Sequence, residues 1–305
     1  KTKFNVTPEE FAEDVTKLIK KGLRVVGGCC GTTPDYIKAL TEKSKDLKPL
    51  ETKNKNLTVV SSYTKAVEFL NSPILIGERI NPTGKKRFKQ ALIENDISYI
   101  LNEGVSQQEK GVHILDVNVG LPDIDENKML KKTVEELQAV IDLPLQIDTA
   151  DVTAMENALR IYNGKALINS VNGKEESMKA IFPLLKKYGG VVVALTLDEN
   201  GIPETAEGRV EIAKNILKVA KEYGIEKNNI IFDTLAMTIS ADQLAANETL
   251  KALNIIKNEL GCHTSLGVSN VSFGLPNRDV INSVFFSLAL ENGLSGAIMN
   301  PYSAE

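Results

Sequence analysis

The feature that most constrains this chain of 305 residues is an alternation of short apolar runs with amphipathic segments, which begins at residue 74. The runs at 74–76, 113–117, 145–147, 166–168, 191–195, 230–232, 263–266 and 296–299 are predicted to be strands. The segments between them repeat apolar residues at helical spacing, as in Leu130, Val134, Leu137 and Ile141. Short apolar strands joined by helices are typical of a parallel sheet that is buried on both faces.

Eight strands joined by helical segments predict an α/β protein with a (β/α)8 TIM barrel over residues 73–305. A doubly wound open sheet is the alternative, because it has the same alternation of strands and helices. Only residues 300–305 follow the last predicted strand. The helix that completes the eighth repeat of such a barrel is therefore expected outside these 305 residues.

The first 45 residues form a separate group of predicted elements. Thr7 is a good N-cap and Pro8 suits the first turn, so a helix is expected to run from there to about Gly22. A strand over 23–26, a glycine-rich turn and a helix over 34–45 complete an αβα unit that is too small to bury a core of its own. Residues 46–72 read as a linker, with a short adapter over 59–70.

Composition excludes several classes of protein. The net charge of −4 comes from well-mixed acidic and basic residues, so nucleic acid is not an expected partner. No apolar run is long enough to span a membrane and the N-terminus lacks the pattern of a signal peptide, so a cytoplasmic location is expected. Three cysteines suit a reducing compartment, and the adjacent Cys29 and Cys30 suggest metal binding or packing rather than a disulfide.

Polar residues stand at or just after the end of every predicted strand. They are Glu78 and Asn81, Asp116 and Asn118, Asp148, Asn169, Asp198, Asp233, Ser269 and Asn270, and Asn300. In a barrel these positions meet at one mouth, where catalytic groups lie. Such residues also cap the helices that follow strands, which would explain any one of them. Capping explains the whole set less well, because several of them precede further loop residues rather than a helix.

The chemistry of this predicted mouth limits its ligand. The sequence has no dinucleotide-binding glycine loop, no Walker loop and no His-Glu-x-x-His motif. Its two histidines, His113 and His263, begin strands and are expected at the opposite end of the barrel. A mouth rich in Asp and Asn favours a ligand with N–H donors. A pterin has adjacent ring and amine N–H groups, which can give a carboxylate two parallel hydrogen bonds.

Five segments resemble the methyltetrahydrofolate (pterin)-binding domain of the cobalamin-dependent methionine synthase family. More distantly they are similar to methyltetrahydrofolate:corrinoid methyltransferases and dihydropteroate synthase. The segments are IGERINPTG at 76–84, LDVNVG at 115–120, QIDT at 146–149, INSVNG at 168–173 and GVSNVSFGLP at 267–276. The family often has Pro where Thr234 stands, but Asp233 beside it is retained.

The resemblance also covers the N-terminal residues. Residues 1–45 resemble the C-terminal end of the family's homocysteine-binding barrel, in which a Gly-Gly-Cys-Cys-Gly segment supplies two of three zinc thiolates. Cys29 and Cys30 occupy those positions. Cys262 precedes a strand at the far end of the predicted barrel, so it is not expected to be the third thiolate. Zinc is therefore expected only with the upstream part of the homocysteine domain.

The resemblance implies a methyltransferase module that binds 5-methyltetrahydrofolate and transfers its N5 methyl group to cob(I)alamin on a partner domain, within methionine synthesis from homocysteine. It assigns the contact with N5 to Asn270 as the catalytic residue, and the pyrimidine edge to Asp148, Asn169 and Asp233. The folate-binding residues that it implies are Glu78, Asn81, Asp116, Asn118, Asp148, Asn169, Asp233, Gly267, Ser269, Asn270, Arg278 and Asn300.

The implied partners are a corrinoid-binding domain or protein and the remainder of the homocysteine-binding barrel. The sequence itself has no Asp-x-His-x-x-Gly corrinoid segment. Three other functions are considered: a stand-alone methyltetrahydrofolate:corrinoid protein methyltransferase, a non-catalytic folate-binding module, and condensation of the dihydropteroate synthase type. The last would need a basic segment for diphosphate near strand eight, and residues 296–303 contain no Lys or Arg.

Overall fold

The computed structural model describes residues 5–53, 55–70 and 72–303, and the chain divides into two compact units, Lys1–Asn56 and Leu57–Glu305. In the first unit, helices α1 (Pro8–Lys20) and α2 (Pro34–Ser44) pack together. Thr7 and Glu10 form a reciprocal capping box at the start of α1, as the N-cap pattern predicts. Phe11 and Tyr36 meet edge to face, with ring centroids 5.7 Å apart.

The strand expected at 23–26 is wrong. These residues form no strand, and the side chain of Val25 is 88% exposed. A strand is held by hydrogen bonds to a neighbouring strand, and the described part of this unit contains none. The unit is therefore a pair of helices joined by an irregular segment.

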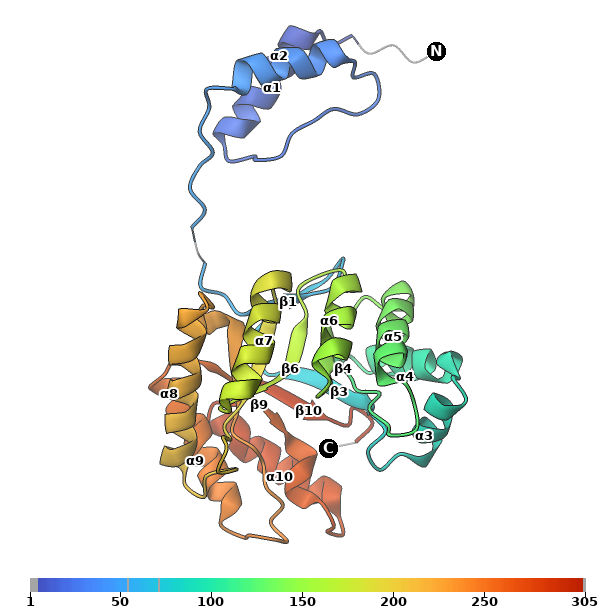
Figure 1. The fold of residues 1–305 in the computed structure, drawn as a ribbon, viewed down its shortest axis with the longest axis vertical. Helices are drawn as coiled ribbons and strands as arrows, with labels where there is room; N and C mark the ends of the chain where they lie inside the picture. Colours follow the sequence, from blue (N-terminus) through green and yellow to red (C-terminus); the bar gives the residue numbers. More distant parts are fainter. Residues whose placement is uncertain (1–4, 54, 71, 304–305) are drawn as a thin grey trace. The chain divides into compact units, whose positions relative to one another are not determined.

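The second unit is a closed barrel of eight parallel strands, which confirms the predicted fold and rules out the open sheet (Figure 1). The strands are β3 (Ile74–Ile80), β4 (Ile114–Val117), β5 (Leu145–Asp148), β6 (Leu167–Asn172), β7 (Val191–Leu195), β8 (Ile230–Asp233), β9 (His263–Gly267) and β10 (Gly296–Met299). They pair in chain order, and β10 closes the barrel against β3. All their carboxyl ends therefore meet at one mouth.

Helices lie outside the strands (Figure 1). They are α3 (Lys86–Ile93), α4 (Ile97–Glu109), α5 (Glu126–Val140), α6 (Val152–Ile161), α7 (Glu175–Tyr188), α8 (Ala206–Glu222), α9 (Ala245–Asn258) and α10 (Arg278–Glu291), with short 3-10 turns η1 (Lys227–Asn229) and η2 (Val268–Ser272). Leu115 and Leu137 belong to the apolar layer between strands and helices, whereas Ile76 and Ile231 belong to a second cluster within the barrel. No helix in the described ranges is long and apolar enough to cross a membrane.

A hairpin of β1 (Val59–Ser61) and β2 (Ala66–Glu68) joins the barrel unit. The sequence pattern predicts a linker over 46–72 with a short adapter over 59–70. The structure instead buries Val60 and Phe69 in the same cluster as the inner barrel residues. Ser61 exchanges backbone hydrogen bonds with Lys165, which precedes β6. The hairpin therefore covers the amino end of the barrel, opposite the mouth.

Candidate active site at the barrel mouth

Strands β4 and β5 place two acid–amide pairs at the mouth. Asp116 and Gln146 are register partners, and the Gln146 amide donates to Asp116 Oδ1 at 2.7 Å. Two residues further along the chain in each case, Asn118 Nδ2, just after β4, donates to Asp148 Oδ2 at 3.0 Å. Side chains two residues apart in a strand share a face, so these four side chains point to the same side of the sheet. The structure thus brings Asp116, Asn118 and Asp148 together as predicted.

The carboxyl groups of this cluster have raised pKa values. Burial, followed by the nearby charge of Asp148, raises the pKa of Asp116 well above its usual range. Burial raises the pKa of Asp148 to about 6, against the opposing effect of the hydrogen bond from Asn118. Groups of this kind can accept hydrogen bonds as anions and also hold protons near neutral pH.

Strand β8 brings a third buried carboxyl to the mouth. Asp233 Oδ1 accepts a hydrogen bond from the Leu235 amide at 2.7 Å, and the Gly267 amide is a second backbone donor to this carboxylate. Burial raises the pKa of Asp233 to about 6, while these donors and the nearby Arg209 charge oppose the rise. The chain folds Asp233 into a setting that partly compensates a buried negative charge.

Strand β6 supplies Asn169, which is the register partner of Asp148. Both residues line a cavity of about 360 Å³, together with Lys174 and Ser177 from the start of the next helix. The peptide bond between Asn169 and Ser170 is cis. An amide and a carboxyl therefore stand side by side at the rim of one cavity, where they can accept hydrogen bonds from the same flat ligand.

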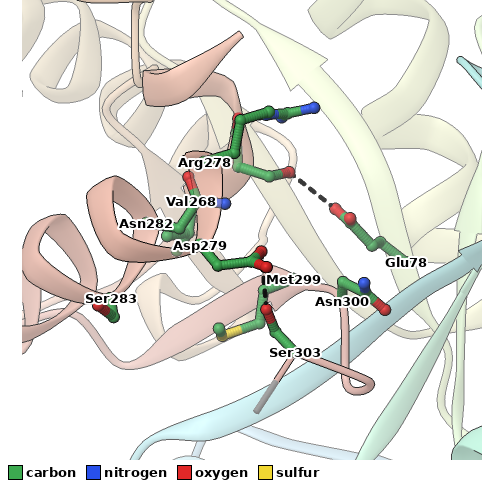
Figure 2. Close-up of a pocket in the computed structure, with 10 residues that line it drawn as sticks. Glu78, Val268, Arg278, Asp279, Asn282, Ser283, Met299, Asn300 and Ser303 are labelled. Atoms are coloured by element: carbon green, nitrogen blue, oxygen red, sulfur yellow. Dashed lines mark hydrogen bonds between the residues drawn. The ribbon is translucent and has the colours of Figure 1, made fainter. Parts of the chain in front are cut away.

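The 3-10 turn η2, which follows β9, contacts β3 at the mouth through side chains. Ser269 Oγ donates to Glu78 Oε2 at 3.0 Å, and Arg278 donates to the Ser269 carbonyl at 2.7 Å. Figure 2 shows the cavity beside this contact, in which Glu78 and Asn300 face residues of α10 such as Asp279. The cavity has a volume of about 130 Å³. Three predicted residues from strand ends and one from α10 therefore surround one hollow.

Asn270 lies in η2, directly after the end of β9, and is exposed. Within the described ranges its side-chain amide makes no hydrogen bond to the protein. A Cβ atom on Gly267 would lie 2.9 Å from Asn270 Nδ2, so the glycine leaves room for this amide. The structure therefore presents Asn270 with both its donor and its acceptor free for a ligand.

Two predicted residues brace their own loops. Asn81 Oδ1 accepts from the Thr83 amide at 2.9 Å, and Asn300 Oδ1 accepts from the Tyr302 amide at 3.2 Å. Each contact is an Asx turn, which is the local role that Asn often has after a strand. Among the residues that the structure describes, the side-chain amide nitrogens of both residues have no protein partner, whereas their oxygens accept from the backbone of their own loops.

Lys85 is a mouth residue that the sequence pattern did not indicate. Its Nζ donates to the Glu78 carbonyl at 3.0 Å. Burial lowers the pKa of Lys85, and the negative charges of Glu78 and Asp116 oppose that change. In the sequence Lys85 stands in a basic run with Lys86 and Arg87, which resembles a solvated loop, so no local signal separated it from its neighbours.

The two histidines lie at the amino end of the barrel, as their positions before or at the start of strands predict. His263 is the first residue of β9, and His113 directly precedes β4, so both lie at the amino end. Burial lowers the pKa of His113 and lowers that of His263 to about 4. Neither ring is available for acid–base chemistry at the mouth.

Cys29 and Cys30 are exposed in the N-terminal unit, with their sulfur atoms 3.7 Å apart. Two thiolates on one tetrahedral zinc ion, with Zn–S bonds of about 2.3 Å, lie roughly 3.8 Å apart, so the pair fits two corners of such a site. The residues that the structure describes contain no cluster of three or more His, Cys, Asp or Glu side chains that could hold a metal. Cys262 is buried near the amino end of β9.

Both units of the chain match known protein families. Residues 1–44 match the homocysteine S-methyltransferase family. The methionine synthases of Mycobacterium tuberculosis and Mycobacterium leprae are each 34% identical to the chain, over 313 and 319 residues. Each match covers 97% of this chain but 26% of the relative, so the chain spans about a quarter of their length.

Solved structures share the barrel. Dihydropteroate synthase from Xanthomonas albilineans, in complex with 7,8-dihydropteroate, has a TM-score of 0.61 at 18% identity and covers 81% of this chain and 93% of its own. The Stenotrophomonas maltophilia enzyme has a TM-score of 0.59 at 16% identity, over 78% and 91%. At these identities the likeness concerns the fold alone. The family of pterin binding enzymes matches residues 77–300, which span the barrel and its polar mouth, and the chain belongs to this family.

Proposed function

We propose that the barrel mouth binds 5-methyltetrahydrofolate and passes its N5 methyl group to cob(I)alamin on a partner domain, as a step of methionine synthesis from homocysteine in the cytoplasm. The observation that carries this proposal is the pair of carboxyl groups, the half-buried Asp148 and the buried Asp233, at the mouth of a pterin-binding barrel. The similarity to methionine synthases supports the choice of reaction.

The pterin is held through its pyrimidine edge. This edge offers a ring N–H and an exocyclic amine, and a carboxylate can accept both in parallel. Asp148 and Asp233, whose pKa values are about 6, are mostly anionic at neutral pH and can act as these acceptors. Asn169, next to Asp148 in the register, contributes an amide that can donate or accept. Together the three residues fix the orientation of the ring, which contributes proximity rather than proton transfer.

Asn270 meets N5 in this proposal. The methyl group departs from a tertiary amine that would be a very poor leaving group as an anion, so N5 must receive a proton or a strong hydrogen bond. The amide of Asn270 can present its oxygen to a protonated N5 or its NH2 group to an unprotonated one. Its exposure and its lack of a protein partner among the described residues leave both faces of the amide free for this contact.

The methyl acceptor is cob(I)alamin, which supplies the nucleophile. It is too large for a closed pocket, so a partner domain must bring it to the open rim on which Asn270 stands. Cys29 and Cys30 supply two thiolates of a zinc site that is completed by the upstream part of the homocysteine barrel. In this proposal the 305-residue chain alone binds zinc weakly or not at all.

A single-turnover assay tests the proposal. The protein is mixed with 5-methyltetrahydrofolate and free cob(I)alamin, and methylcobalamin is followed by its absorbance. We expect transfer well above the rate without protein. Folate binding without transfer would instead support a non-catalytic folate-binding module. Transfer to a separate corrinoid protein but not to free cob(I)alamin would favour a stand-alone corrinoid protein methyltransferase.

A further inference from the structure

Arg209 is a buried cation in the first turns of α8. Its side chain is 2% exposed, and no carboxylate lies within ion-pair distance of it in the described ranges. Its guanidinium donates to four acceptors: the Pro203 carbonyl at 3.0 Å, the Thr234 carbonyl at 2.8 Å, the Leu235 carbonyl at 3.3 Å and Thr249 Oγ1 at 2.8 Å. Burying a charge is costly unless it is well hydrogen-bonded, so this arrangement needs a reason.

The contacts converge on the loop that follows Asp233. The Thr234 carbonyl and the Leu235 N–H belong to the same peptide unit. The Arg209 guanidinium donates to the carbonyl of this peptide unit, and the N–H of the same peptide unit donates to Asp233 Oδ1 at 2.7 Å. Leu235 has a φ of 63°, in the left-handed region that a leucine rarely adopts. The Arg209 guanidinium thus stabilises an unfavourable backbone conformation at Leu235, and the Leu235 amide fixes the Asp233 carboxylate.

Few charged groups act on Arg209 and Asp233. The carboxylates whose charges act on Arg209 are Glu248, Asp233 and Asp242, and Glu248 accepts hydrogen bonds from the Ala206 amide and Lys251. Asp233 is buried beside it, and the Arg209 charge helps to lower the pKa of this carboxyl against the effect of burial. Because a pterin edge needs an ionised carboxylate as acceptor, the cation favours the state of Asp233 that binds.

We propose that Arg209 is a positioning residue for folate binding, which fixes the Asp233 carboxylate through the Thr234–Leu235 peptide and places a buried positive charge beside it. This inference rests on the proposed function, because it assumes that Asp233 receives the pterin edge. Arg209 itself does not touch the ligand.

The test is the pH dependence of 5-methyltetrahydrofolate affinity, measured by calorimetry from pH 5 to pH 8.5. For the unmodified protein we expect affinity to fall as pH drops below about 6. In Arg209→Gln the midpoint should rise by about one pH unit, because a nearby opposite charge has been removed. The part of the affinity loss that comes from protonation should then be about ninefold at pH 5, about twofold at pH 7 and negligible at pH 8.5, where only the loss of positioning that Arg209→Lys shares should remain.

Three variants make the result specific. Arg160→Gln removes the same charge from an exposed site on α6 and should leave the midpoint unchanged. Arg209→Lys keeps a cation but lacks the planar fork that reaches the Pro203 and Thr234 carbonyls together, so its midpoint should stay near that of the unmodified protein while its affinity falls at every pH. This variant also serves if Arg209→Gln fails to fold. In an Asp233→Asn background, Arg209→Gln should have no further effect on the midpoint.

Several outcomes would overturn the inference. One is an equal loss of affinity at all pH values in Arg209→Gln, which indicates structural damage alone. Another is the same midpoint shift in the Asp233→Asn background, and a third is an Arg209→Lys variant with unchanged affinity. If the unmodified protein does not bind 5-methyltetrahydrofolate at all, the proposed function fails first, and the two failures are thereby distinguished.

Discussion

The two ends of the barrel are built on opposite principles. At the amino end, the β1–β2 hairpin buries Val60 and Phe69 against the inner strand residues, and both are almost fully shielded from solvent. At the carboxyl end, carboxyl groups are withdrawn from solvent instead, and burial raises the pKa values of Asp116, Asp148 and Asp233. The amino end gains stability from apolar contacts, whereas the carboxyl end loses stability by burying carboxyl groups that a ligand can use.

The largest effect is expected at the amino end. Phe69→Ala removes a ring that packs against His263 and over Gly296. The loss of a buried phenylalanine should reduce the free energy of unfolding by about 3 to 5 kcal/mol, measured by urea denaturation. Folate affinity should change less than about twofold in the folded variant. Phe273→Ala, an exposed aromatic near the mouth, is the matched control and should change stability by about 0.5 kcal/mol or less.

Catalysis at the mouth should respond next most strongly. If Asn270 strengthens its contact with N5 as charge develops there, Asn270→Ala should lower the rate of methyl transfer to cob(I)alamin by a factor on the order of 10², with a smaller change in pterin binding. Single-turnover kinetics and calorimetry measure the two quantities. Equal losses in rate and binding would make Asn270 a ligand-positioning residue only, and no loss in either would remove it from the site.

Binding should respond to the buried carboxyls. Asp148→Ala or Asp233→Ala removes a charge-assisted acceptor worth ~1.5 to 3 kcal/mol, so 5-methyltetrahydrofolate affinity should fall about tenfold or more. Asp142→Ala removes a carboxylate that lies beside the hairpin, where it accepts from Tyr63, and should leave affinity unchanged. Unchanged binding in both mouth variants would contradict the assignment of the pyrimidine edge.

The smallest effect is a gain in stability at the mouth. Asp148 and Asp233 have pKa values of about 6 in the folded protein against an ordinary value of 3.8, so between those values the folded state holds protons that the unfolded chain has released. The free energy of unfolding should therefore fall as pH rises from 4 to 6. Asp148→Asn should flatten this dependence and raise stability at pH 7 by about 1 kcal/mol. A steeper dependence in the variant would contradict this reading.

The barrel and much of its mouth could be predicted because their signals are local. Strand ends such as Asp148 and Asn169 are found by reading where an apolar run stops, and parallel topology then brings them to one end. The packing of the hairpin and the role of Arg209 were missed because both come from contacts between distant segments, and Lys85 was missed because its basic run resembles a solvated loop. Arg209, for instance, reads as one more polar position of an amphipathic helix until the structure sets it against the loop after β8.

The strand at 23–26 shows the opposite error. Its residues have the composition of a strand, yet a strand exists only where another backbone is present to bond it. The same argument explains why the hairpin at 59–68 forms: each of its short strands has the other as partner, and Ser61 adds bonds to Lys165. Composition alone does not tell which of these two segments forms strands, whereas the presence of a pairing partner does.

The way in which the chain enters the barrel has a mechanical consequence. Asn228 donates to the Leu57 carbonyl at 3.0 Å, and its own carbonyl accepts from Thr58 Oγ1 at 2.8 Å, so the first residues of the barrel unit are tied to the segment before β8. A force on the preceding chain therefore acts first on the contacts of Leu57 and Thr58 with Asn228 and on the β1–β2 hairpin. A force applied to the chain before Leu57 therefore enters the barrel unit at its apolar amino end, away from the carboxyl groups of the mouth.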